Sequence, residues 1–181
     1  MGMLEELRSE CGDRRRVLAV LESELARMDA GESPDLEVMQ DALCFLTQYP
    51  DVIDNAKETA IQQQLIKRDA ATRPLIDALR EERAAVHGTA VALLDAVEDM
   101  LEDVVVALDA FKALAGEYVA LQRHLFDREE QDLLPRAREL LQAPDLGTAG
   151  DTLRRCRRSK LRNLSRQRFE RLVGSRPATR L

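Results

Sequence analysis

The stretch LEELRSECGDRRRVLAVLESELARM, residues 4–28, decides the fold class, because its apolar residues recur at the spacing of one helix face. We therefore predict a long amphipathic helix over about residues 4–28. Residues 30–34 bring a glycine and a proline close together and predict the break that follows this helix. The residues of the expected inward stripe are Leu4, Leu7, Cys11, Val17, Leu18, Leu21 and Leu25.

A second helical pattern begins after Asp35, whose side chain can cap a helix N-terminus. Pro50 interrupts this pattern, because proline lacks a backbone N–H and clashes with the preceding turn. We expect the helix to bend there, or to restart after Asp51 and continue to about Leu65. Its predicted inward residues are Met39, Leu43, Leu46 and Thr47, then Glu58, Ile61 and Leu65.

Two more helices are predicted, over residues 74–100 and 105–141, with a break near residues 102–103. Pro74 suits a first helical position, whereas Pro135 is expected to bend or break the last helix. Four long amphipathic helices joined by short loops, with no segment of strand period, predict an all-α, up-down four-helix bundle. The predicted inward residues of the third helix are Leu75, Leu79, Val86, Leu93 and Val97.

The chain divides by charge into an acidic body and a basic tail. Residues 152–181 carry 11 Arg and Lys against one acidic residue, a net charge of about +10, and the rest of the chain carries about −16. We assign residues 1–143 to the bundle and residues 144–181 to a basic C-terminal extension, with one more helix expected near residues 167–173.

Composition indicates a helical protein and argues against several other classes. Aromatic residues make up only 3% of the 181 residues, so Leu, Val, Ile, Ala and Met must build the core. Cys11, Cys44 and Cys156 are too widely spaced for a disulfide framework or a zinc knuckle. There is no secretory leader, no bilayer-spanning run, no phosphate-binding loop and no Ser-His-Asp constellation, so we expect a cytoplasmic protein that is not an enzyme.

Three stretches carry a resemblance to a known family. Residues 42–51 (ALCFLTQYPD) with residues 54–58 (DNAKE) resemble the family segment Y-P-D-x-x-H-H-P-K-E. Residues 79–83 (LREER) resemble L-x-x-E-H, and residues 118–135 resemble H-x-x-x-E-E-x-x-x-L-P in their second half. Together, in this order and at these separations, they resemble the hemerythrin-like (HHE-type) four-helix bundles, over most of residues 1–141.

The resemblance implies a family role and shows how this chain departs from it. Hemerythrin-like proteins hold two irons between histidines and bridging carboxylates of facing helices, and they bind oxygen there. In this chain the histidines that we can place are all replaced, with Asn55 at the second of the paired histidines, and both carboxylates are kept. The family-equivalent metal positions hold Cys11, Asp54, Glu58, Arg83, Leu125 and Glu129.

Two interpretations of these positions stay open. In the favoured one no metal is bound: Arg83 pairs with Asp54, Glu58 and Glu129, and Leu125 fills space with apolar atoms. In the alternative the chain is a metalloprotein with an altered, carboxylate-rich iron or hard-cation site. Its ligands would be Glu58, Glu129 and Asp54, with His87 or Cys11 as possible additions.

The remaining candidates are the other histidine, the cysteines and the tail. We expect His124 on the surface, Cys11 and Cys44 in the core, and a lowered thiol pKa at Cys156 if this residue is exposed among its arginines. The basic run can bind nucleic acid, an acidic partner or an anionic membrane surface, but the favoured interpretation is that it lies against its own acidic bundle. Its basic residues are Arg154, Arg155, Arg157, Arg158, Lys160 and Arg162.

The sequence thus predicts a hemerythrin-like protein with an impaired diiron site and no bound cofactor, which acts as a binding or regulatory module or is a decayed paralogue. A functioning metalloprotein is the first alternative, and binding of nucleic acid or an acidic partner through the tail is the second. Its physiological partner is unknown.

Overall fold

The computed structural model describes residues 3–49, 55–147 and 169–173, and all regular structure in these ranges is helical, with no strand. The predicted all-α class is therefore confirmed. Two single turns of helix at residues 143–147 and 169–173 supplement the main elements. These elements are α1 (Met3–Asp29), α2 (Leu36–Tyr49), α3 (Asn55–Arg68), η2 (Ala70–Thr72), α4 (Arg73–Leu101), α5 (Leu108–Arg128), η3 (Glu129–Leu133) and α6 (Leu134–Leu140).

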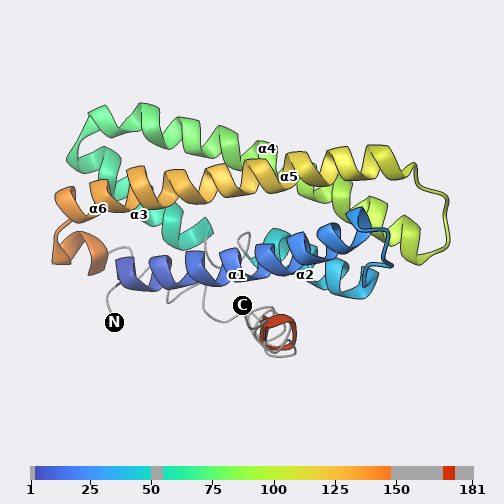
Figure 1. The fold of residues 1–181 in the computed structure, drawn as a ribbon. Coiled ribbons are helices and arrows are strands. Elements are labelled where there is room, and N and C mark those ends of the chain that lie inside the picture. Colours follow the sequence, from blue (N-terminus) through green and yellow to red (C-terminus); the bar gives the residue numbers. More distant parts are fainter. Residues whose placement is uncertain (1–2, 50–54, 148–168, 174–181) are drawn as a thin grey trace.

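The long helices run lengthwise through the molecule (Figure 1), and their buried side chains form one hydrophobic core. Helix α1 contacts α2 and α5, and α4 also contacts α2 and α5, so these four helices surround the interior. Helix α3 contacts α6. The α1–α2 and α4–α5 connections lie at the same end of the molecule (Figure 1).

The apolar stripes predicted from spacing line this core. On α1, five of the seven predicted residues are buried, while Leu4 and Leu25 at the margins of the stripe are half-buried. On α4 the stripe is shifted at its start, because Ile76 is fully buried and the predicted Leu75 is only half-buried. The other predicted α4 residues, Leu79, Val86, Leu93 and Val97, are buried.

The turn between α1 and α2 is fixed by two acidic side chains. Asp35 accepts a hydrogen bond at its Oδ1 from the Val38 N–H at 3.1 Å, which confirms the predicted cap. Glu24, fully buried on α1, accepts at its Oε2 from the Asp35 N–H at 2.9 Å and from Arg27 Nη1 at 3.1 Å. Gly31 adopts a φ of +79°, which a residue without a Cβ tolerates best.

The α4–α5 connection confirms one predicted boundary and corrects another. Helix α4 ends at Leu101, and residues 102–103 form the expected break. The following helix was predicted to start at Val105, but α5 begins at Leu108. Residues 104–107 lie outside any helix, and Ala107 is extended with ψ 108°, so the connection is longer than expected.

Pro135 does not break the helical path. The residues before it, Glu129–Leu133, form a π-helical turn, in which the Leu134 N–H donates to the Glu129 carbonyl. Pro135 then lies in the first turn of α6, directly after this π-helical turn. Of the two predicted outcomes, a break at Pro135 is contradicted by these continuous helical turns.

Two predicted features lie wholly or partly outside the described residues. Pro50, where the second helix was expected to bend or restart, and residues 51–54 lie outside the described residues. Of the extra helix expected near residues 167–173, the described part, residues 169–173, is helical. Its Phe169 ring lies 5.6 Å from the Phe45 ring of α2, and Arg16 of α1 lies 5.3 Å from the Phe169 ring centroid.

Candidate functional site

A cluster of charged side chains occupies the core where four elements meet. Arg14 comes from α1, Glu58 from α3, Arg83 from α4 and Glu129 from the start of η3. Three of these side chains are nearly inaccessible: Arg14 is 6% exposed, Glu58 5% and Glu129 6%, whereas Arg83 is 20% exposed. We call these four residues the ion-pair cluster.

Both carboxylates of the ion-pair cluster are bound by guanidinium groups. Arg83 Nη2 donates to Glu58 Oε2 and also to Glu129 Oε1, the latter at 2.5 Å. Arg14 Nη2 donates to Glu129 Oε2 at 2.9 Å. Each oxygen of Glu129 thus accepts from a different arginine. The cluster holds two positive and two negative charges, and this balance is what makes their common burial tolerable.

Further donors complete the environment of Glu58. Gln62, one turn along α3, donates from Nε2 to Glu58 Oε1 at 2.8 Å. Arg80 of α4 in turn donates from Nε to Gln62 Oε1 at 3.1 Å, so the amide is held in one orientation. Both oxygens of Glu58 therefore accept a hydrogen bond. This satisfies a buried carboxylate that would otherwise be costly.

Burial and charge repulsion raise the pKa of Glu58, whereas its partner Arg83 lowers this pKa. Removal from solvent raises the pKa of Glu58, the nearby Glu129 charge raises this pKa further, and Arg83 opposes both effects, so that the net direction is upward. Arg83 keeps its charge, since both glutamates raise the pKa of its guanidinium although burial lowers it. Arg83 is therefore the fixed cation that holds the two carboxylates together.

Arg14 also has an aromatic and a sulfur neighbour. Its Cζ lies 5.2 Å from the ring centroid of the buried Phe126, within range of a cation–π interaction. Buried Cys11, one turn earlier on α1, has its pKa raised to about 11 by desolvation, although the Arg14 charge lowers it. At neutral pH Cys11 is therefore a protonated thiol, which is a poor metal ligand and a poor nucleophile.

The structure brings some of the predicted residues together and separates others. The expected pairing of Arg83 with Glu58 and Glu129 is present. Leu125 is buried, as expected, with 2% of its surface exposed. Both histidines are exposed: His124, as predicted, and His87, the possible extra ligand of the altered metal site. Asp54, Cys156 and the basic run from Arg154 to Arg162 lie outside the described residues.

Arg14 is the member of the cluster that sequence reasoning missed. The signal was present, because Arg14 falls on the α1 stripe between Cys11 and Val17, at a position where the spacing calls for an apolar residue. Glu24 departs from the same stripe and is also buried. A charged residue at a core position of an otherwise regular stripe indicates a buried partner on another helix.

The donor set does not fit the pair of irons that the resemblance implies. The described ligand-equivalent positions offer a protonated thiol, a leucine and two carboxylates, whose four oxygens already accept from arginines or, at Glu58 Oε1, from an amide. Two fixed cations at this place repel a divalent ion. Within residues 3–49, 55–147 and 169–173, no group of three or more His, Cys, Asp or Glu side chains is placed to hold a metal ion.

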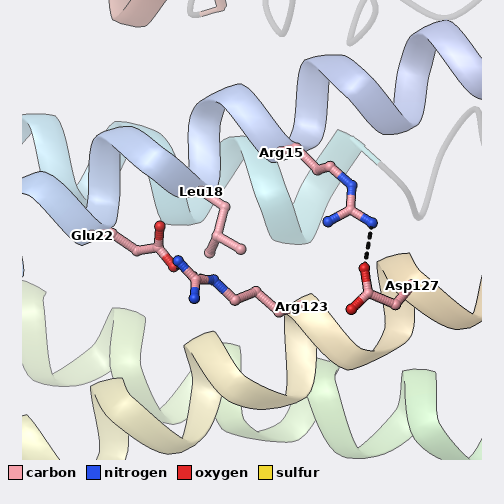
Figure 2. Close-up of a pocket in the computed structure, with 5 residues that line it drawn as sticks. All are labelled: Arg15, Leu18, Glu22, Arg123 and Asp127. Atoms are coloured by element: carbon pink, nitrogen blue, oxygen red, sulfur yellow. Dashed lines mark hydrogen bonds and ion pairs between the residues drawn. The ribbon is translucent and has the colours of Figure 1, made fainter. Parts of the chain in front are cut away.

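A separate groove of about 370 Å³ lies between α1 and α5 (Figure 2). Arg15 reaches across it to Asp127 Oδ1 at 2.8 Å, and Arg123 Nε lies 2.7 Å from Glu22 Oε1. Leu18 forms the apolar part of the lining. Because each guanidinium already faces a carboxylate, a charged ligand would have to displace one of these pairs.

Comparison of the chain with protein-family models, with curated proteins and with solved structures finds no match. Among the described helices, none is long and apolar enough to cross a membrane.

Proposed function

We propose that this chain is a hemerythrin-like four-helix bundle whose metal site has been replaced by the ion-pair cluster, and that it acts as a metal-independent binding or regulatory module. The observation that carries this proposal is the bonding of Glu129, which accepts from Arg83 at one oxygen and from Arg14 at the other. Those two oxygens are the ones that a bridging carboxylate would give to a pair of metal ions.

The balance of buried charges in the ion-pair cluster supports this proposal. Two carboxylates buried close together need positive charge nearby, and a metalloprotein of this type supplies it with metal ions. Here Arg14 and Arg83 supply it permanently, because a guanidinium does not lose its proton in a protein. The fold is then independent of metal supply, and function moves to the surface of a rigid helical scaffold.

Metal analysis of the full chain tests the proposal directly. The protein is expressed with ample iron, purified without a histidine tag, and measured by plasma mass spectrometry and visible absorption. We expect less than about 0.1 metal per chain and no oxo-bridge absorption. A content of about two irons per chain, as in diiron proteins, would establish the metalloprotein alternative instead.

A restoration variant tests the family part of the proposal separately. Cys11→His, Arg83→His and Leu125→His together rebuild three of the imidazoles at the family-equivalent positions and remove one of the two cations. If the bundle is of hemerythrin-like type, this variant takes up iron that the parent chain does not. As a matched control, exposed positions on the same helices receive the same number of histidines: Arg8→His, Glu81→His and Arg123→His. Equal uptake by the two variants would contradict the placement of the site.

A further inference from the structure

The end of the molecule at the α4–α5 connection exposes large apolar side chains. Val105 is 97% exposed, Val104 49%, Leu108 48% and Leu101 37%. Four of the five large hydrophobic residues found exposed in the described part of the chain thus fall within eight consecutive positions. We call these four residues the apolar end patch. Single exposed hydrophobic residues are ordinary, but such a local group marks a contact site.

Acidic residues surround the apolar end patch without any basic residue among them. Over residues 84–111 the chain contains six Asp and Glu and no Lys or Arg. All six are exposed, namely Asp95, Glu98, Asp99, Glu102, Asp103 and Asp109. The nearest basic residue that follows, Lys112, is held by Asp29 at 2.8 Å. This end of the molecule therefore carries a strong negative potential around an apolar centre.

The apolar end patch continues into a groove shared with the α1–α2 connection. Leu101 lines this groove of about 440 Å³ together with Pro34 and Leu36. Asp35 and Glu37 lie in the same lining, and the one arginine there, Arg27, is paired with Glu24 and Glu32. Apolar atoms flanked by acidic side chains thus extend from one connection to the other, across the end that Figure 1 shows at the right.

We propose that this end is a docking surface for a basic amphipathic helix of a partner protein. An apolar face of such a helix would cover Val105, Leu108 and the Leu101 groove, while lysines and arginines along its flanks would face the six acids. Apolar burial would supply affinity, and the opposite charges would supply orientation and a fast encounter.

The same charges disfavour other occupants. Nucleic acid and anionic membranes carry the charge sign of the surface itself and would be repelled. Two copies of this chain that met through their apolar end patches would bring six acids of one against six acids of the other. A cationic segment with an apolar face has neither conflict, so it fits both properties of the patch.

The experiment uses the full chain and a fluorescent amphipathic helical peptide of leucine and lysine, with binding followed by anisotropy at low and high salt. Val105→Ser should weaken binding by about fivefold, since a buried valine side chain contributes roughly 1 kcal/mol or more. Val91→Ser, which changes an exposed valine elsewhere on α4, should alter the affinity by less than about twofold. Because Val105 is 97% exposed, its substitution does not disturb the core.

A charge-reversal pair tests the acidic part of the surface. Asp99→Lys with Glu102→Lys should weaken peptide binding by about tenfold at low salt, and this loss should shrink at high salt. Glu81→Lys with Glu117→Lys makes the same change in net charge at exposed positions outside the surface and should have a much smaller effect. Circular dichroism verifies that every variant keeps its helix content.

Three results would overturn the proposal. Equal losses from Val105→Ser and Val91→Ser would show that the apolar end patch does not bind the peptide. Equal binding of a sequence-scrambled peptide of the same composition would show that only net charge matters. Self-association of the full chain that Val105→Ser abolishes would identify the occupant as another copy or its basic tail, and not a separate partner.

Discussion

Arg14 and Glu129 stand 115 residues apart in the sequence and meet in the core at 2.9 Å between Nη2 and Oε2. Both side chains are only 6% exposed, so water screens their attraction little. The pair joins α1 to the turn that follows α5 and therefore closes the interior across the first and last long helices. Arg83 joins the same carboxylate to α4 and α3, which makes Glu129 the point at which four elements are linked.

We predict that removal of Arg14 alone is strongly destabilising. Arg14→Met keeps an unbranched side chain of similar length but leaves one oxygen of the buried Glu129 without its cation. The free energy of unfolding should fall by about 3 kcal/mol, as when other buried ion pairs lose one partner. Urea denaturation followed by circular dichroism measures this change.

Arg123 offers the matched control for Arg14. It lies on the groove side of α5, is 61% exposed and pairs with Glu22. Arg123→Met should change stability by less than about 0.5 kcal/mol, because exposed ion pairs contribute little. If both variants lost the same amount, the burial of Arg14 would not be the reason for its effect.

The fully apolar version of the ion-pair cluster should behave differently from the single variant. When Arg14→Met, Arg83→Met, Glu58→Leu and Glu129→Leu are combined, no buried charge is left unpaired. We expect a protein at least as stable as the parent, within the range of about 0 to +3 kcal/mol that such replacements give. Chemical denaturation of the quadruple variant beside Arg14→Met measures the difference. A quadruple variant less stable than the single one would show that the charges themselves maintain the packing.

The sequence predicted the helices better than it predicted the core. Leu7, Val17 and Leu21 are buried because their spacing alone decides which side of α1 faces inward. Arg14 shares that side, but it is neither apolar nor at a ligand-equivalent position of the resemblance, so neither pattern singles it out. Which partner a buried charge meets depends on how distant helices pack, and no local pattern of one helix encodes that.

Two helix boundaries, near Pro135 and at the start of α5, also differ from the prediction. Pro135 reads as a helix breaker when only α-helical geometry is considered, but the π-turn of Glu129–Leu133 places it in the first turn of α6. The start of α5 at Leu108, and not at Val105, leaves three apolar residues, Val105, Val106 and Ala107, outside the helix. Their apolar character suggested an inward face of the helix, but Val105 is 97% exposed, and the two β-branched valines are poorer helix formers than the leucine at which α5 begins.

Glu24 provides a prediction about the α1–α2 turn. It is fully buried and accepts from the Asp35 N–H at 2.9 Å and from Arg27 Nη1 at 3.1 Å, so Glu24→Ala removes two hydrogen bonds to a charged acceptor. We expect a loss of about 2 kcal/mol in the free energy of unfolding. Glu24→Gln keeps an acceptor oxygen and should lose less. Glu32→Ala removes the other, exposed acidic partner of Arg27 and should be nearly neutral, and thermal unfolding of the three variants tests this order.

The raised pKa of Cys11 leads to a prediction of how the free energy of unfolding changes at alkaline pH. Its pKa is raised from 9.0 to about 11 in the folded state, so between these values the folded protein keeps a proton that the unfolded chain has lost. Stability therefore falls as the pH rises through this window, by a total of about 2–3 kcal/mol from this one group. Cys11→Ser removes the titration at nearly constant volume. Its free energy of unfolding should fall less steeply than that of the parent between pH 9 and pH 11, when both are measured in urea at each pH. Parallel profiles for the two proteins would mean that Cys11 ionises as freely in the folded state as in the unfolded chain, which its burial at 2% exposure contradicts.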